Sequence, residues 1–96
     1  MHNSSIAHFN FIGDSIIGCS VNFEAGSHTA NRYNERSDKT IWVTNQFQKI
    51  NTISEKFGAL IGDHSKIGAN AILSPGTILA KNSIVKRLEL IEQNPL

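Results

Sequence analysis

The sequence has few of the residues that mark specialised classes of protein. Its 96 residues include one cysteine, and lysine plus arginine (9) exceed aspartate plus glutamate (8) by one charge. The single cysteine, Cys19, excludes an internal disulfide and fits a reducing compartment. A balanced charge gives no long-range attraction toward nucleic acid or a membrane surface, so we expect neither as a partner.

Long apolar runs are absent as well. No stretch approaches the ~18 apolar residues that are needed to span a bilayer. The first eight residues lack the apolar segment of a signal peptide, so we expect a cytoplasmic protein. Hydrophobic residues at 40% and charged residues at 18% still predict a folded chain. The length allows a single domain over residues 1–96 with a thin core.

The sequence contains a repeat of six residues in two blocks, 5–29 and 59–91. Large residues recur six apart at Phe11, Ile17, Phe23 and Thr29, and again at Ile61, Ile67, Leu73, Leu79 and Val85. A small residue follows most of them four positions later. Three positions after a large residue lie Gly26, Asn70, Gly76 and Asn82, which are residue types that tolerate left-handed backbone conformation.

A period of six matches neither a helix nor a hairpin, and it predicts a short strand followed by a corner. Three such hexads make one triangular coil, and coils stack at the strand spacing of about 4.8 Å. We therefore predict an all-β fold, a parallel β-helix of hexapeptide repeats with about three coils. Two ordinary amphipathic strand pairs are the alternative, but they would not keep a small residue at the fifth place in seven hexads.

The two blocks are separated by residues 30–58, which are too long for a corner. Within them, 40–44 and 49–53 are predicted to pair as strands, so the segment is interpreted as an inserted β-hairpin arm. A lone hairpin is marginal in water, so Trp42 and Phe47 should pack on the coil or on a neighbouring chain.

Both ends of the repeat depart from the pattern. Phe9 falls in the small position of the first hexad, where it is too large. Glu89 falls in the small position of the last hexad, where a buried charge would be costly. We expect the coil to end or to be capped there.

Several strings are more specific than the repeat itself. They are residues 6–15, the pair Val21-Asn22, the triplet Thr29-Ala30-Asn31, and residues 56–64 and 72–76. Together they resemble the acetyltransferase domain of the bifunctional N-acetylglucosamine-1-phosphate uridylyltransferases. They are closer still to archaeal-type sugar-1-phosphate nucleotidylyltransferases, which carry a similar hairpin after this triplet. The resemblance covers about residues 5–86.

This resemblance implies a left-handed β-helix that assembles as a homotrimer, with the helices side by side. It implies acetyl-CoA as co-substrate and an amino-sugar phosphate as acceptor. His8 corresponds to the general base, a role that suits an imidazole because its neutral form is plentiful at pH 7. Asn22 corresponds to a contact with the sugar phosphate, Asn31 to a residue near the amine and thioester, and Ala69 to a small residue near the co-substrate.

The sequence also departs from the family pattern. Phe11 stands where the family has a tyrosine, and Arg87 stands where it has a small residue near the co-substrate. The nucleotidyltransferase domain and the first coils, which supply an acidic partner to the histidine, have no counterpart here. A non-catalytic trimeric scaffold, or a remnant of a sugar nucleotidyltransferase, is therefore the alternative function. Completion in trans by a separate nucleotidyltransferase chain is a further possibility.

The candidate residues also have plainer interpretations. His8 fits a polar corner of the first coil, and Asn22 and Asn31 fit corner hydrogen bonding, which asparagine provides well. The four histidines lack the His-x-x-x-x-His spacing of zinc enzymes built on this repeat, so we expect no metal.

Overall fold

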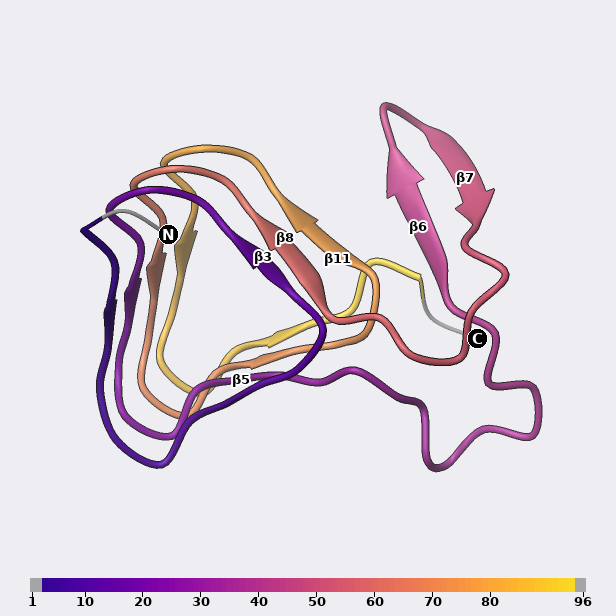
Figure 1. The fold of residues 1–96 in the computed structure, drawn as a ribbon, viewed down its shortest axis with the longest axis horizontal. Helices are drawn as coiled ribbons and strands as arrows, with labels where there is room; N and C mark the ends of the chain where they lie inside the picture. Colours follow the sequence, from indigo (N-terminus) through magenta and orange to yellow (C-terminus); the bar gives the residue numbers. More distant parts are fainter. Residues whose placement is uncertain (1–2, 95–96) are drawn as a thin grey trace.

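The all-β prediction is confirmed by the computed structural model, which describes residues 3–94. These residues form strands and turns, and no helix occurs among them. Most strands are parallel and stack into three sheets, which enclose a three-sided outline when viewed along the stack (Figure 1). This arrangement is compatible with a β-helix.

The sheets are assembled from every third strand of the two repeat blocks. Sheet A contains β1 (Ser5–Ile6), β4 (Asn22–Phe23), β9 (Lys66–Ile67) and β12 (Ile84–Val85). Sheet B contains β2 (Phe11–Ile12), β5 (His28–Thr29), β10 (Ile72–Leu73) and β13 (Leu90–Ile91). Sheet C contains β3 (Ile16–Ile17), β8 (Ala59–Ile61) and β11 (Thr77–Leu79).

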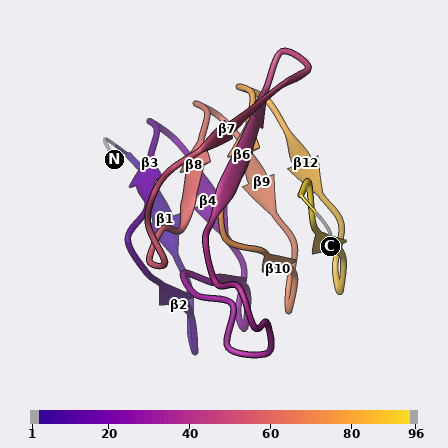
Figure 2. The ribbon, with the colours of Figure 1, turned by 90° about the vertical axis from the view of Figure 1, so that its right-hand side faces the viewer.

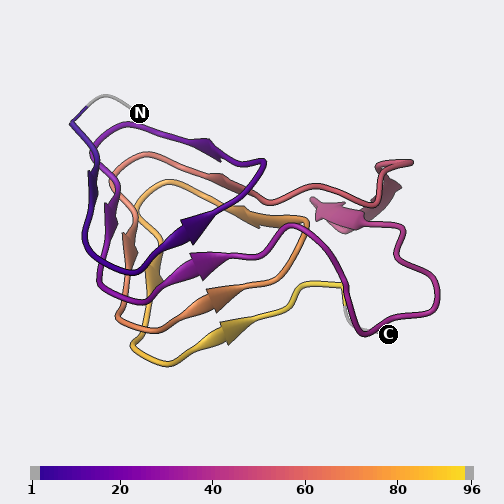
Figure 3. The same cartoon turned by 60° about the horizontal axis from the view of Figure 1, so that its bottom comes forward.

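The pairing register follows the repeat closely. Lys66 pairs with Ile84 eighteen residues later, and the same step relates Leu60 to Ile78. Asn22 pairs with Lys66 across 44 residues, so the segment between the blocks adds 26 residues to one turn of the chain. Figure 2 shows the strands of successive turns lying side by side, and Figure 3 shows the stacked turns from another side.

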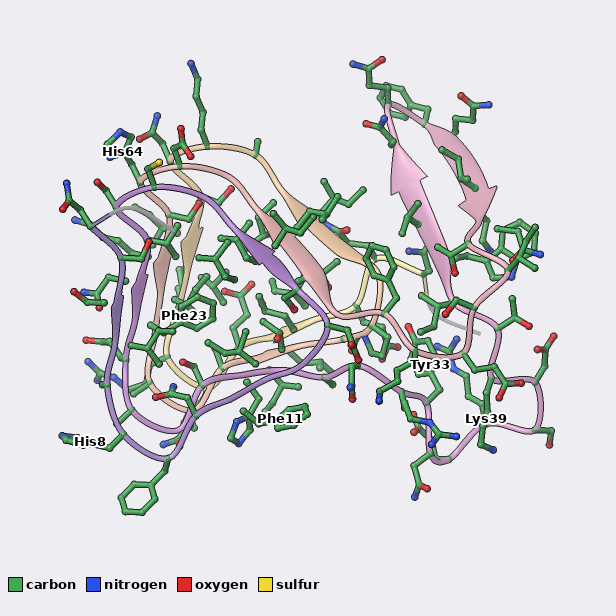
Figure 4. The ribbon with its side chains drawn as sticks, viewed as in Figure 1. His8, Phe11, Phe23, Tyr33, Lys39 and His64 are labelled. Atoms are coloured by element: carbon green, nitrogen blue, oxygen red, sulfur yellow. The ribbon has the colours of Figure 1, made fainter. Side chains whose placement is uncertain are left out.

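The core is three columns of inward side chains, one from each sheet. Sheet A contributes Phe23, Ile67 and Val85, all at least 97% buried, and the ring of Phe23 lies inside the coil in Figure 4. Sheets B and C add their own columns, which are Ile12, Thr29, Leu73 and Ile91 in one and Ile17, Ile61 and Leu79 in the other. Burial of these aliphatic and aromatic side chains is the main stabilising term, at roughly 1.5–3 kcal/mol each.

The predicted frame of the first turn was wrong by one residue. Ile12, and not Phe11, pairs in register with the inward Thr29 and packs against the core, whereas Phe11 is half exposed. Ile12 and the inward Ile17 are five positions apart in place of six, so this corner is one residue shorter than the others. With the frame corrected, Asn10 fills the small position and Phe9 lies outside, 90% exposed.

The small residues at the corners are held by a repeated hydrogen bond. Ser27, Ser65, Thr77 and Ser83 each donate a hydroxyl proton to the backbone carbonyl three residues earlier, at 2.6–2.9 Å. The bond satisfies a hydroxyl that is buried in three of the four cases. It explains why serine and threonine suit this place as well as alanine.

The residue before each small position turns the chain. The four predicted left-handed positions are confirmed, with φ of 77° at Gly26, 58° at Asn70, 83° at Gly76 and 61° at Asn82. The same conformation occurs at Phe9 (56°) and Leu88 (64°), where a bulky side chain makes it costly.

The insertion carries strands β6 (Trp42–Asn45) and β7 (Gln48–Asn51), which pair antiparallel around a turn at Gln46 and Phe47. Of the two places predicted for Trp42 and Phe47, the coil does not cover Phe47, which is fully exposed, and Trp42 is 36% exposed. Packing on a neighbouring chain stays a prediction. The buried side chains in this part of the insertion are Ile41, just before strand β6, and Val43 within it. The Tyr33 hydroxyl also donates to the Pro75 carbonyl at 3.1 Å, which ties the insertion to the coil.

The coil continues through the last hexad before it is capped. Strand β13 pairs in register with β10, so the costly charge at Glu89 does not end the stack. Its carboxylate is half-buried and accepts a hydrogen bond from the Lys86 backbone N–H at 2.8 Å. The Gln93 side chain then both donates to and accepts from the backbone of Ile78, at 2.9 Å each. This amide occupies the edge of sheet C that a further strand would fill.

The buried column of sheet A predicts a sharp contrast between two phenylalanines. Phe23→Ala should lower the free energy of unfolding by about 3–5 kcal/mol, because it leaves a cavity in a fully buried site. Phe9→Ala is the matched control and should change it by less than about 0.5 kcal/mol, since the ring is exposed. Chemical denaturation at one protein concentration measures both, and equal losses would contradict the corrected frame.

The turn of the hairpin predicts a stabilising substitution. Gln46 and Phe47 have φ of 50° and 67°, the pattern of a turn that favours Asn-Gly. Phe47→Gly should stabilise the hairpin by about 1 kcal/mol, because glycine adopts this conformation without strain. Slower hydrogen exchange of the hairpin amides would show it. Gln48→Gly, placed in strand β7, should instead speed exchange, and the same sign for both variants would refute the turn assignment.

Candidate functional site

The corners of successive turns lie above one another, and the one between sheets A and B collects three of the residues singled out in the sequence. Gly26 N–H donates to the His8 carbonyl, Asn70 N–H to Ala25, and Leu88 N–H to Ala69, at 2.9–3.0 Å. We call the residues His8, Ala25, Ala69 and Arg87, one from each turn, the His8 corner. At the strand spacing the column spans about 14 Å from His8 to Arg87.

His8 begins this column and its side chain is exposed. In Figure 4 it projects outward from a corner of the coil. Its imidazole has no hydrogen-bond partner among residues 3–94, and the neighbouring Phe9 ring lies 6.4 Å from it between centroids. An exposed imidazole of this kind can accept a proton from a bound molecule.

The middle of the His8 corner is open and small. Ala25 is exposed, and Ala69 is half-buried. The Ala69 N–H donates to the Glu24 carboxylate at 3.0 Å, which fixes the backbone of the third turn against the second. Side chains of one carbon leave room here for an extended ligand to lie along the corner.

Asn22 lies on the outer face of sheet A, close to the same corner. It pairs in register with Ser5 on one side and Lys66 on the other, so all three side chains point outward from neighbouring strands. Asn22 and Lys66 are both exposed. An amide beside an ammonium group forms a surface that can bind an anion such as phosphate.

Asn31 is not brought to the His8 corner. It lies at the corner between sheets B and C, where the insertion leaves the coil and returns. Phe57 N–H donates to the Asn31 carbonyl, and Gly58 N–H donates to the Asp14 carbonyl, at 2.9 and 3.0 Å. We call Gly13, Asp14, Asn31 and Gly58 the Asn31 corner. About five residues of sheet B separate it from His8, which corresponds to roughly 16 Å.

The outer face of sheet B connects these two corners. His28 pairs with Phe11, and its Nδ1 accepts a hydrogen bond from the Phe11 backbone N–H at 3.0 Å. This bond requires an unprotonated Nδ1, so a neutral His28 carries its proton on Nε2. The ring of Phe11 lies outside the coil in Figure 4 and provides no hydroxyl on this face.

The third corner, between sheets C and A, contains Cys19 and His64. The Cys19 N–H donates to the Asp63 carboxylate at 2.8 Å, and the thiol is exposed. Across residues 3–94, no three His, Cys, Asp or Glu side chains gather where they could hold a metal ion. The expected absence of a metal stays a prediction.

Among residues 3–94, two groups have a shifted pKa, and both belong to the insertion. Burial raises the pKa of Tyr33, while the Arg36 guanidinium, 3.5 Å above its ring, partly offsets the rise. Hydrogen bonding from the Thr40 backbone N–H lowers the pKa of the exposed Asp38. Neither group lies at the His8 corner, so these shifts concern the anchoring of the insertion.

The sequence did not single out Lys66 and Asp14 as neighbours of the candidate residues. Lys66 precedes an inward residue in its hexad, as Asn22 does, so their shared outward position was a usable signal. No signal in the sequence indicated that the two strands pair, because this pairing depends on how many residues the insertion adds to one turn of the chain. The contact of Asp14 with Asn31 was not predicted, because it depends on the shortened corner and the six-residue period places every corner at the same interval.

Within residues 3–94 there is no helix of the length and apolar character needed to cross a membrane.

Comparison with known proteins gives several relatives, although no family model matches the chain. The chain is 36% identical over 95 residues to the bifunctional protein GlmU of Methanococcus vannielii, an alignment that covers 98% of the chain and 22% of the relative. It is 39% identical over 77 residues to a bifunctional sugar-1-phosphate nucleotidylyltransferase/acetyltransferase of Sulfurisphaera tokodaii, covering 79% of the chain and 18% of the relative.

A bacterial relative extends this similarity. The bifunctional protein GlmU of Wigglesworthia glossinidia brevipalpis is 36% identical over 80 residues, which cover 83% of the chain and 16% of the relative. The chain thus spans about a fifth of the length of the curated relatives it matches.

Proposed function

Because the chain belongs to the family of bifunctional GlmU and sugar-1-phosphate nucleotidylyltransferase/acetyltransferase proteins, we propose that it is an acetyltransferase domain. It transfers the acetyl group of acetyl-CoA to the amino nitrogen of an amino-sugar phosphate. The observation that carries the proposal is the His8 corner, which aligns an exposed imidazole, two alanines and a guanidinium in one column.

The residues of this corner take complementary roles in the proposed reaction. The imidazole of His8 accepts a proton from the amine as its nitrogen attacks the thioester carbonyl. The carbon–sulfur bond then breaks, and coenzyme A leaves as the thiolate, which is reprotonated. Ala69 leaves room for the co-substrate along the corner, whereas Arg87 stands where the family has a small residue and narrows the column at its far end.

The sugar phosphate is proposed to lie toward sheet A. Asn22 donates hydrogen bonds to it, and Lys66 on the adjacent strand supplies the positive charge. Both side chains are exposed, so the free protein keeps these polar groups solvated and does not bear the cost of burying them.

The site is proposed to form between protomers of a homotrimer. His8 and Asn31 lie at opposite ends of sheet B, so a single chain does not present both to one small acceptor. Outward apolar side chains support association: Ile16, Leu60 and Ile78 form a ladder on sheet C, and Phe11 and Leu90 lie on sheet B, 51% and 59% exposed. We propose a left-handed β-helix of about three coils with a hairpin arm as the protomer. The cytoplasmic location stays a prediction.

Phe11 favours a second candidate, a non-catalytic trimeric scaffold. The exposed ring offers no hydroxyl to a substrate, and the His8 imidazole lacks an orienting carboxylate among the described residues. A general base without such a partner loses orders of magnitude in rate. Calorimetry with acetyl-CoA separates the two candidates: saturable micromolar binding supports the enzyme, and no binding at millimolar ligand supports the scaffold.

A site shared between protomers predicts complementation. His8→Ala and Asn31→Ala should each abolish acetyl transfer to glucosamine 1-phosphate, measured as coenzyme A release. Refolding the two variants together at equal amounts should restore about a quarter of wild-type activity. A site is intact only when the chain that supplies His8 is the Asn31→Ala variant and the neighbour that supplies Asn31 is the His8→Ala variant. With equal amounts, each condition is met in half of the cases, which gives about a quarter.

Two results would contradict this proposal. A mixture as inactive as the single variants, from chains shown to have exchanged, would exclude a shared site. Wild type and His8→Ala releasing coenzyme A at the same rate would exclude His8 as the base.

The anion surface on sheet A predicts a separation of kinetic constants. Lys66→Ala should raise KM for the sugar phosphate about tenfold and leave kcat nearly unchanged, because the ammonium group binds substrate and transition state alike. Lys56→Ala, an exposed lysine of the insertion, is the matched control and should change neither. A fall in kcat with KM constant would show that Lys66 acts in the chemical step instead.

A further inference from the structure

We infer that Asp14 is a positioning residue that turns the Asn31 side chain so that its carbonyl oxygen receives the amine of the acceptor. This inference rests on the proposed function, since it concerns the substrate end that lies at the Asn31 corner. It begins from one contact: the Asn31 Nδ2 donates to the Asp14 Oδ2 at 2.8 Å.

The shortened first corner places Asp14 where it can make this contact. The inward Ile12 and Ile17 are only five positions apart, and Asp14 between them takes the left-handed conformation with φ of 47°. The step of 17 residues that relates Ile12 to Thr29 also relates Asp14 to Asn31, so the two stand in register on neighbouring turns. Aspartate tolerates this backbone conformation better than most residues.

Gly13 makes room for the amide. A Cβ at this position would lie 2.7 Å from the Asn31 Nδ2 and 2.7 Å from the ring of Phe11. Any larger residue would therefore displace the Asn31 side chain or the ring. The absent side chain allows Asn31 to reach the carboxylate one turn below.

The contact determines which end of the amide faces outward. A carboxylate only accepts hydrogen bonds, so the NH₂ group of Asn31 must be the end that faces it. The Asn31 Oδ1 is left without a hydrogen-bond partner among residues 3–94, and the backbone of Asn31 is held by Phe57. The contact with Asp14 is solvent-exposed, and it leaves the Asn31 Oδ1 as the end of the amide that can accept a hydrogen bond from a ligand.

An acceptor beside a negative charge selects the chemistry of its ligand. It suits an amine or ammonium group, which donates N–H bonds and is attracted by Asp14, and it disfavours a phosphate. The acceptor sugar would therefore lie with its amine at this corner and its phosphate toward Lys66. An amine that donates to Asn31 directs its remaining lone pair away from the amide, as attack on a thioester requires.

The first test reads the Asn31 side chain directly. In protein labelled with ¹⁵N-asparagine, Asp14→Gly should shift the side-chain NH₂ signals of Asn31, which Asn31→Ala identifies by their loss. Glycine suits the positive φ of this position, so the variant should fold. Asp38→Gly, a change at an exposed aspartate in the insertion, is the control and should leave these signals unchanged. Unchanged signals in Asp14→Gly would overturn the positioning role.

The second test measures the preference for an amine. Calorimetry should show wild type binding glucosamine 1-phosphate about tenfold more tightly than glucose 1-phosphate, because the ammonium bond is charge-assisted. Asp14→Gly and Asn31→Ala should each remove this preference, and the double variant should lose no more than either single one. Asp14→Asn, which keeps an acceptor oxygen without the charge, should retain part of it.

The outcomes separate this inference from the proposed function. A preference that survives in Asp14→Gly, or additive losses in the double variant, would overturn the inference and leave the proposed function standing. Failure of the wild type to bind either sugar would overturn the proposed function and the amine as ligand. The NMR signals decide the orientation of Asn31 whether or not the sugar binds.

Discussion

The vertical alignment of inward side chains is the constraint on which the rest of the structure depends. Each strand is only two to four residues long, so one turn of the chain buries very little by itself. Phe23, Ile67 and Val85 gain their burial from one another because successive turns repeat in register. Every corner must therefore return the chain to the same position, and most corners do so with a left-handed residue followed by a small one.

The functional surface follows from the same constraint. Corners that repeat in register become columns, and the column that begins at His8 places its side chains about one strand spacing apart. The corner between sheets B and C has a different composition, because one turn is a residue short and the insertion departs there. The surroundings proposed for the two ends of the substrate are opposite in charge: Lys66 lies beside Asn22 on the outer face of sheet A, and Asp14 lies beside Asn31 at the Asn31 corner.

The insertion is attached at the corner where Asn31 lies, and its anchors reinforce that corner. The Phe57–Asn31 backbone hydrogen bond closes the inserted segment at its base. Tyr33 contacts the Pro75 carbonyl of the next turn, and Arg36 stacks on the Tyr33 ring while donating to the Asn94 carbonyl. A few specific contacts therefore tie the charged segment to the coil, while Phe47 at its tip remains in solvent.

Much of this protein was determined by its sequence alone. The period of six predicted parallel stacked strands, and Gly26, Asn70, Gly76 and Asn82 marked left-handed corners, because these are local preferences of the backbone. The family resemblance pointed to His8, Asn22, Asn31 and Ala69, but not to which of them lie together. Only the tertiary structure decided that His8 and Ala69 share a corner, that Asn31 lies elsewhere, and that Lys66 and Asp14 are their neighbours. These contacts join residues 17 to 44 positions apart, and their register depends on one shortened corner and one insertion that no local pattern measures.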